Sequence, residues 1–155
     1  MVFGIGNPDR GDDAAGRAVA RRLRGVLPAD VAIIEHDGEA TALLAGFAGA
    51  AAVWLVDACL SGAAPGTIRR LDVHDGPLPR TLSGISTHGF GPAEAVELAR
   101  ALGRLPARCI VYAIEGASFA PGAPPSPDVA AAIAGVADRL RDEFTNTGTE
   151  DGHDA

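Results

Sequence analysis

The chain has 155 residues, which predicts one domain with room for a hydrophobic core. Hydrophobic residues make up 47% and charged residues 21%, which excludes a disordered, collagen-like or coiled-coil protein. Lys and Arg number 13 against 20 Asp and Glu, and the net charge of -7 disfavours extended binding to nucleic acid.

Two further features indicate the compartment. The two cysteines, Cys59 and Cys109, have neither the number nor the spacing of a disulfide framework or a thiolate zinc site. No basic and apolar leader opens the chain, and the longest apolar stretch, residues 48–56, is far shorter than the roughly 20 residues of a membrane-spanning helix. We therefore expect a cytoplasmic protein without a membrane partner.

Apolar runs of strand length alternate with longer helical patterns, which indicates repeated βαβ units. The nearly continuous apolar run at 52–56 is typical of a central strand covered on both faces, and we expect Asp57 to end it. The more polar strand that follows, with Arg69 and Arg70, suits an edge or antiparallel position. The predicted elements are strand 2–5, helix 12–23, strand 31–35, helix 39–47, strands 52–56 and 67–73, helix 92–102, strand 108–114 and helix 126–144.

The connections between these elements differ in character. Residues 75–91 are too long and irregular for a simple connection and are typical of a functional loop. The polar residues 145–155 are expected to form a disordered tail. The whole predicts one domain, residues 1–144, with a three-layer α/β/α architecture and a mostly parallel, mixed sheet of five strands.

Ligands of such sheets bind beyond the carboxyl ends of the strands. Three candidates lie there: the acid pair Asp12 and Asp13 after the first strand, Asp57 after the most apolar strand, and His88 before the helix at 92. Two carboxylates and one imidazole suit a divalent metal with open coordination positions, or acid-base chemistry. Structural roles compete with both, since an Asp often caps a helix, and we expect Asp12 to cap the first one.

Other kinds of site fit less well. Gly4 and Gly6 begin a dinucleotide-binding fingerprint, but Asp9 occupies the third glycine position, and acids at the helix start would repel a phosphate. The sequence has neither a Walker A motif nor a G-x-S-x-G elbow, and nothing marks Cys59 as an activated nucleophile. We expect no organic cofactor.

The first loop, Gly4-Ile5-Gly6-Asn7 followed by Gly11-Asp12-Asp13-Ala14-Ala15-Gly16, resembles the opening signature of the hydrogenase maturation proteases. These endopeptidases trim the large subunit of nickel-iron hydrogenases. The resemblance extends in order from residue 2 to about residue 144. Its further segments are residues 55–58 and 62–68 for the second motif, 86–89 for the third, and 114–116 with 126–129 for the closing loop and last helix.

The resemblance implies a phosphorylase/hydrolase-like fold and an endopeptidase that removes a C-terminal extension from the nickel-loaded large-subunit precursor. It places the metal contacts at Asp13, Asp57 and His88, with the nickel supplied by the bound substrate. Two roles for this trio stay open. A carboxylate can activate water, as in an aspartic-type endopeptidase, with His88 orienting it, or the trio can serve recognition only.

Three further residues are candidate substrate or loop contacts: Asn7, Gly38 and Glu115. Asn7 can hold its own loop by bonding to the backbone or can meet the substrate. The family commonly has a Gly-Gly or Gly-Thr pair where this chain has Gly38-Glu39.

Two other functions remain as alternatives. Peptidyl-tRNA hydrolases have a related fold and a Gly-Asn-Pro-Gly loop, but here no His occurs between Asn7 and His36, and the charge of -7 opposes tRNA. A chaperone that binds the nickel-loaded subunit without cutting it is the second. We expect the partner to be the hydrogenase large-subunit precursor, with no nucleic acid bound, and the protein to be a monomer.

Overall fold

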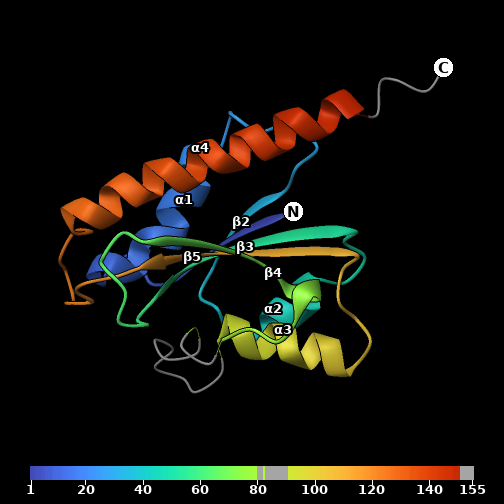
Figure 1. The fold of residues 1–155 in the computed structure, drawn as a ribbon, viewed down its shortest axis with the longest axis horizontal. Coiled ribbons are helices and arrows are strands. Elements are labelled where there is room, and N and C mark those ends of the chain that lie inside the picture. The colour runs from blue at the N-terminus through green and yellow to red at the C-terminus, as the bar shows by residue number, and fades with distance from the viewer. Residues whose placement is uncertain (80–81, 83–90, 151–155) are drawn as a thin grey trace.

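The computed structural model describes residues 1–79, 82 and 91–150, with side chains up to residue 146. Strands and helices alternate along this part of the chain, and the helices lie on both sides of one sheet (Figure 1). None of the helices in the described ranges combines the length and hydropathy needed to cross a bilayer.

The sheet has five strands in the order β2-β1-β3-β5-β4. β1 pairs in parallel with β2 and β3, and β3 pairs in parallel with β5. β4 is antiparallel to β5 at one edge, which confirms the mixed sheet and the edge position expected of this polar strand. The strands are β1 Val2–Ile5, β2 Ile33–His36, β3 Ala52–Cys59, β4 Ile68–Asp72 and β5 Arg108–Glu115.

Two apolar clusters cover the two faces of the sheet. On one face, alternate residues of β3 and β5, such as Val56 and Tyr112, pack with α1 and α4. On the other face, Leu55 and Val111 pack with α2 and α3 (Figure 1). Side chains alternate between the faces of a strand, so each position fixes which helices a residue meets. The helices are α1 Ala15–Leu23, α2 Ala40–Gly46, α3 Pro92–Ala101 and α4 Pro127–Glu150.

The expectation that Asp57 ends its strand was wrong. β3 continues to Cys59, because β5 offers a paired residue at each position up to Glu115. Asp57 is therefore a strand residue, opposite Ala113, and its side chain points to the α2 and α3 face between Leu55 and Cys59. The rigid strand, rather than a loop, positions this carboxylate.

The last helix is longer than predicted. α4 continues to Glu150, into the polar segment 145–155 that we expected to be a disordered tail. The Phe144 ring packs on Trp54 with ring centroids 4.5 Å apart, and the Thr145 hydroxyl donates to the carbonyl of Arg141. Extending a formed helix costs little compared with starting one, so the anchored turn allows the polar residues to continue it.

Candidate functional site

The loop after β1 packs closely against the start of the first helical turn. Gly6 has φ +137°, and a Cβ there would lie 1.9 Å from the carbonyl oxygen of Asp13. The Nε of Arg17 donates to the Gly6 carbonyl at 2.6 Å. Glycine is therefore required at position 6, and its absent side chain lets Asp13 approach the end of β1.

Asp13 belongs to a short 3-10 helix, Gly11–Ala14, that precedes α1. Its half-buried carboxylate accepts a hydrogen bond from the backbone N–H of Asn7 at 3.1 Å. Burial raises the pKa of Asp13 above its usual value, although the Asn7 N–H and the charges of Arg10 and Arg17 act in the other direction. The loop thus holds the Asp13 carboxylate at the end of β1, where it is partly shielded from water and its ionisation is less favourable than in solution.

Asp57 projects from β3, and its Oδ1 accepts from the N–H of Ala58 at 2.8 Å. The pKa of Asp57 lies well above the ordinary value, first because the carboxyl is desolvated and second because the negative charge of Asp13 opposes its ionisation. The effect of Asp13 on Asp57 follows from the sheet: β1 and β3 are adjacent parallel strands, so their carboxyl ends lie at the same edge of the sheet, which we call the rim. A cation between two such carboxylates would relieve their repulsion.

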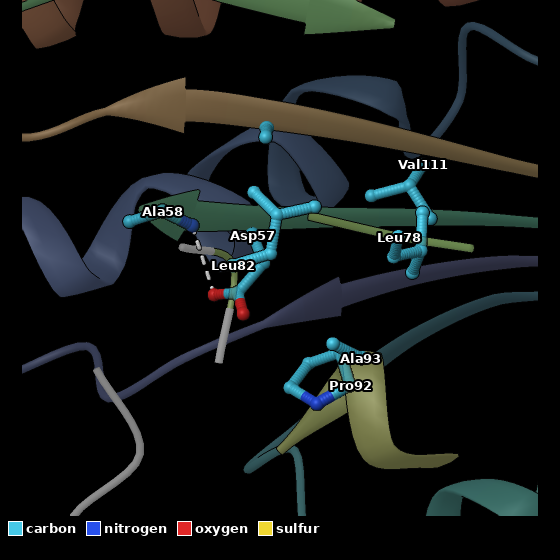
Figure 2. A pocket seen from close by; sticks show the side chains of 8 residues that line it. Asp57, Ala58, Leu78, Leu82, Pro92, Ala93 and Val111 are labelled. Carbon is cyan, nitrogen blue, oxygen red and sulfur yellow. Dashed lines mark hydrogen bonds between the residues drawn. The ribbon is translucent and has the colours of Figure 1, made fainter. Parts of the chain in front are cut away.

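A small cavity adjoins Asp57 on the face of the sheet that α3 covers (Figure 2). Its volume is about 10 Å³, close to the space that one water molecule needs. Figure 2 shows the Asp57 carboxylate on the side of β3 that faces the first residues of α3. Apart from Asp57, the walls of the cavity are apolar, so Asp57 supplies its charge. The lining residues are Asp57, Ala58, Leu78, Leu82, Pro92, Ala93, Val111 and Ala113.

His88, the third residue of the predicted trio, lies outside the described residues. Within the ranges that the structure describes, no cluster of three His, Cys, Asp or Glu side chains has a metal-binding arrangement. The structure therefore brings Asp13 and Asp57 together and leaves the contribution of His88 as a prediction.

Asp12 does not cap the first helix as we expected, because α1 begins at Ala15 and Asp12 is fully buried. Its carboxylate accepts from the backbone N–H groups of Ala117 at 2.7 Å, Ser118 at 2.9 Å and Ser126 at 2.6 Å, and also from the Ser126 hydroxyl. Desolvation opposes ionisation, but these hydrogen bonds hold the pKa of Asp12 below its usual value. Asp12 therefore ties the β1–α1 loop to the β5–α4 loop.

Glu115 has a similar structural role on the other side of the rim. It is 2% exposed and accepts from Ser61 N–H at 2.8 Å, Ser61 Oγ at 2.7 Å and Gly62 N–H at 3.1 Å. The thiol of Cys59 also donates to it, at 3.2 Å. Burial and then this bond raise the pKa of Cys59 to about 12, so the thiol stays protonated at neutral pH and is no nucleophile.

The structure places the other two candidate contacts in turns. Asn7 is exposed, and its Oδ1 accepts from the N–H of Asp9 at 2.9 Å, which holds the loop. Gly38 has φ +89°, and a Cβ there would lie 2.8 Å from the Ile5 side chain. The following Glu39 caps α2 through the N–H groups of residues 41 and 42. Sequence patterns could not reveal the burial of Asp12 and Glu115, because their donors lie far away along the chain.

Comparison with known proteins decides the family. Residues 18–143 match the family model of HycI, hydrogenase maturation protease. The chain belongs to the hydrogenase maturation protease family. It is a peptidase of the hydrolase class, from a family that acts in general on hydrogenase large-subunit precursors. The matched range includes Asp57 and His88 and begins after the loop of Asp13.

Solved structures of the family have the same fold. The chain is 26% identical to the hydrogenase maturating endopeptidase HybD from Escherichia coli, with a TM-score of 0.75, and the match covers 95% of this chain and 92% of that one. HycI, a [NiFe] hydrogenase maturation protease from Thermococcus kodakarensis, matches at 24% identity and a TM-score of 0.72, over 93% of this chain and 90% of that one. Curated protein sequences gave no match.

Proposed function

We propose that this protein is the endopeptidase that removes a C-terminal extension from the nickel-loaded large-subunit precursor of a nickel-iron hydrogenase. The nickel arrives in the precursor and is part of the substrate, so the protein needs no resident metal or organic cofactor. The metal adds binding energy only when it has been inserted, which makes cleavage a checkpoint on insertion.

The observation that carries this proposal is the pair of acids Asp13 and Asp57, one in the 3-10 helix after β1 and one in β3 two residues before its end. Asp13 and Asp57 lie on adjacent elements, and the charge of Asp13 opposes the ionisation of Asp57. A divalent cation in the substrate would stabilise both carboxylates in their ionised form. Two oxygens and one nitrogen form a ligand set that suits nickel while leaving coordination positions for the precursor's own ligands.

We propose His88 as the nitrogen ligand. In the sequence it shortly precedes Pro92, and Pro92 lines the cavity beside Asp57. The two acids can act on the peptide bond as well as on the metal: a carboxylate at the rim can accept a proton from the water that attacks the scissile carbonyl. Recognition and catalysis then share one site.

The test is cleavage of a purified large-subunit precursor, with and without nickel, followed by mass spectrometry. The proposal expects loss of the C-terminal peptide from the nickel-loaded precursor only. Asp13→Asn, Asp57→Asn and His88→Ala should each abolish this cleavage while the circular dichroism spectrum stays unchanged. Asp9→Asn is the matched control, because Asp9 is an exposed acid of the same loop.

Other results would change the assignment. Normal trimming by the Asp13 and Asp57 variants would show that these acids are not the site. Tight binding of the nickel-loaded precursor without any cleavage would identify a chaperone. Release of the peptide from a peptidyl-tRNA, with the precursor left intact, would favour the tRNA alternative.

A further inference from the structure

Two consecutive arginines of β4, Arg69 and Arg70, point to opposite faces of the sheet. Arg70 lies on the face that α4 covers, where its guanidinium forms a salt bridge with Glu143 and lies 6.0 Å from the centre of the Tyr112 ring. Arg70 therefore has a structural partner. It fastens the edge strand to the last helix.

Arg69 lies on the other face, in the same cross-strand row as Asp57. The register places Arg69 opposite Ala113 of β5, and Ala113 opposite Asp57 of β3. Directly paired residues point to the same face, so these three side chains share the face of the cavity beside α3. The residue between the two charged ones is Ala113, which is 1% exposed and is covered by the other residues that line the small cavity. A peptide that meets both charged side chains would therefore run along the edge of the sheet where β3 and β5 end.

The spacing of this row matches a short length of peptide. Neighbouring strands lie about 4.8 Å apart, so two steps separate Asp57 and Arg69 by roughly 10 Å at the backbone. An extended peptide advances about 3.3 Å per residue. A substrate strand lying across the rim would therefore span the two side chains with about three residues.

Arg69 has no acidic partner in the part of the chain that the structure describes. It is half-buried, whereas the ion-paired Arg70 is exposed. Glu115, further along β5, forms hydrogen bonds with Ser61, Gly62 and Cys59 and no salt bridge with Arg69. The register places Arg69 level with Asp57, two residues before the end of β3, and the charge of Arg69 acts on the Cys59 thiol.

A half-buried cation without an anion pays a desolvation cost that a bound carboxylate would offset. The planar guanidinium fits a carboxylate with two parallel hydrogen bonds, and it fits a single carbonyl oxygen less well. Asp13 and Asp57 are acids that attract the metal end of the substrate, whereas the buried acids Asp12 and Glu115 are occupied by hydrogen bonds from loop donors. The row therefore has a negative end and a positive end.

We propose that Arg69 is a specificity-determining residue of this site that binds a carboxylate of the substrate peptide, about three residues from the part of the peptide that lies at Asp57. This inference rests on the proposed endopeptidase function. It assigns to the substrate an acidic side chain or a terminal carboxylate near the scissile bond. The peptide then runs past the carboxyl ends of β3 and β5 to the start of β4 in a fixed direction.

The experiment compares Arg69→Ala, Arg69→Gln and Arg69→Lys with the matched control Arg70→Ala, using the nickel-loaded precursor. We expect Arg69→Ala and Arg69→Gln to raise KM by roughly 10- to 100-fold, with kcat within about twofold of wild type. Arg69→Lys should recover part of the affinity, since it keeps the charge but not the two parallel bonds. Arg70→Ala should lower the melting temperature and leave KM unchanged.

The position of the carboxylate is located by changing each acid near the cleavage site of the precursor, and separately its C-terminal carboxylate, to the amide. One such change should raise KM for wild type and have no further effect with Arg69→Ala. Salt should weaken binding by wild type more than by Arg69→Ala. An unchanged KM in Arg69→Ala, an equal rise in Arg70→Ala, or full function in Arg69→Gln would overturn the inference while wild-type cleavage still supports the proposed function. A wild-type protein that neither binds nor cuts the precursor would overturn both.

Discussion

Removal of the buried Asp12 carboxylate should destabilise the protein strongly. Asp12→Ala would leave three backbone N–H groups, of Ala117, Ser118 and Ser126, without their acceptor. An unsatisfied buried donor costs about 1–3 kcal/mol. The freed loop can turn some of these donors toward water, so the lower part of the range applies, and we expect a total loss of about 3–5 kcal/mol. For a chain of this size that corresponds to a fall of roughly 10 °C in melting temperature.

The assay is urea unfolding of wild type, Asp12→Ala and the control Asp9→Ala, followed by circular dichroism. Asp9 is exposed, and its carboxylate forms no hydrogen bond with the described residues, so its removal should change the free energy of unfolding by less than about 0.5 kcal/mol. The pKa of Asp12 is lowered in the folded protein, so its ionised form stabilises the fold. This stabilisation is complete at neutral pH and is lost as the pH falls below about 4.

Three results would refute the reasoning. The first is a loss below about 1 kcal/mol in Asp12→Ala, which would mean that the donors find water at little cost. The second is an equal loss in Asp9→Ala. The third is a difference between wild type and Asp12→Ala that does not narrow on acidification, which would mean that ionised Asp12 does not provide the stability.

Two further predictions concern the other buried acids. Asp57→Asn should be more stable than wild type at neutral pH, because the raised pKa of Asp57 means that its ionisation opposes folding. In thermal melts from pH 4 to 8, the difference in melting temperature between the variant and wild type should grow as the pH rises. A difference that stays constant over this range would contradict the prediction. Glu115→Ala should lower the free energy of unfolding, measured in urea, by about 2–4 kcal/mol, because the N–H groups of Ser61 and Gly62 lose their acceptor. A decrease of less than about 0.5 kcal/mol would show that the loop of Ser61 and Gly62 does not depend on Glu115.

The sequence was sufficient for the type and order of the main elements. Strands of continuous apolar residues, such as β3, and the polar β4 with its two arginines are read from hydrophobic patterns, which depend on residues close together in the chain. The same patterns placed Asp13 and Asp57 near strand ends, where ligands of parallel sheets bind. The motifs around these acids identified the family before the fold was known.

The tertiary structure decided what the individual side chains contact. Asp12 and Asp13 are neighbours of the same type, yet one is buried against Ser126 and the other faces the rim, because the β5–α4 loop returns to cover only one of them. Local rules suggest a helix cap for Asp12, and its donors are more than a hundred residues away. No pattern within the first loop contains that information.

The alignment of Asp57 with Arg69 across the sheet also could not be predicted from the sequence alone. The sequence alone established an acidic chain with strands that carry these two residues, but their alignment depends on β5 inserting between β3 and β4. Strand order and register come from the packing of helices on both faces and from backbone pairing between distant segments. The residue types were therefore fixed by the sequence, and their juxtaposition at one site was fixed only by the assembled sheet.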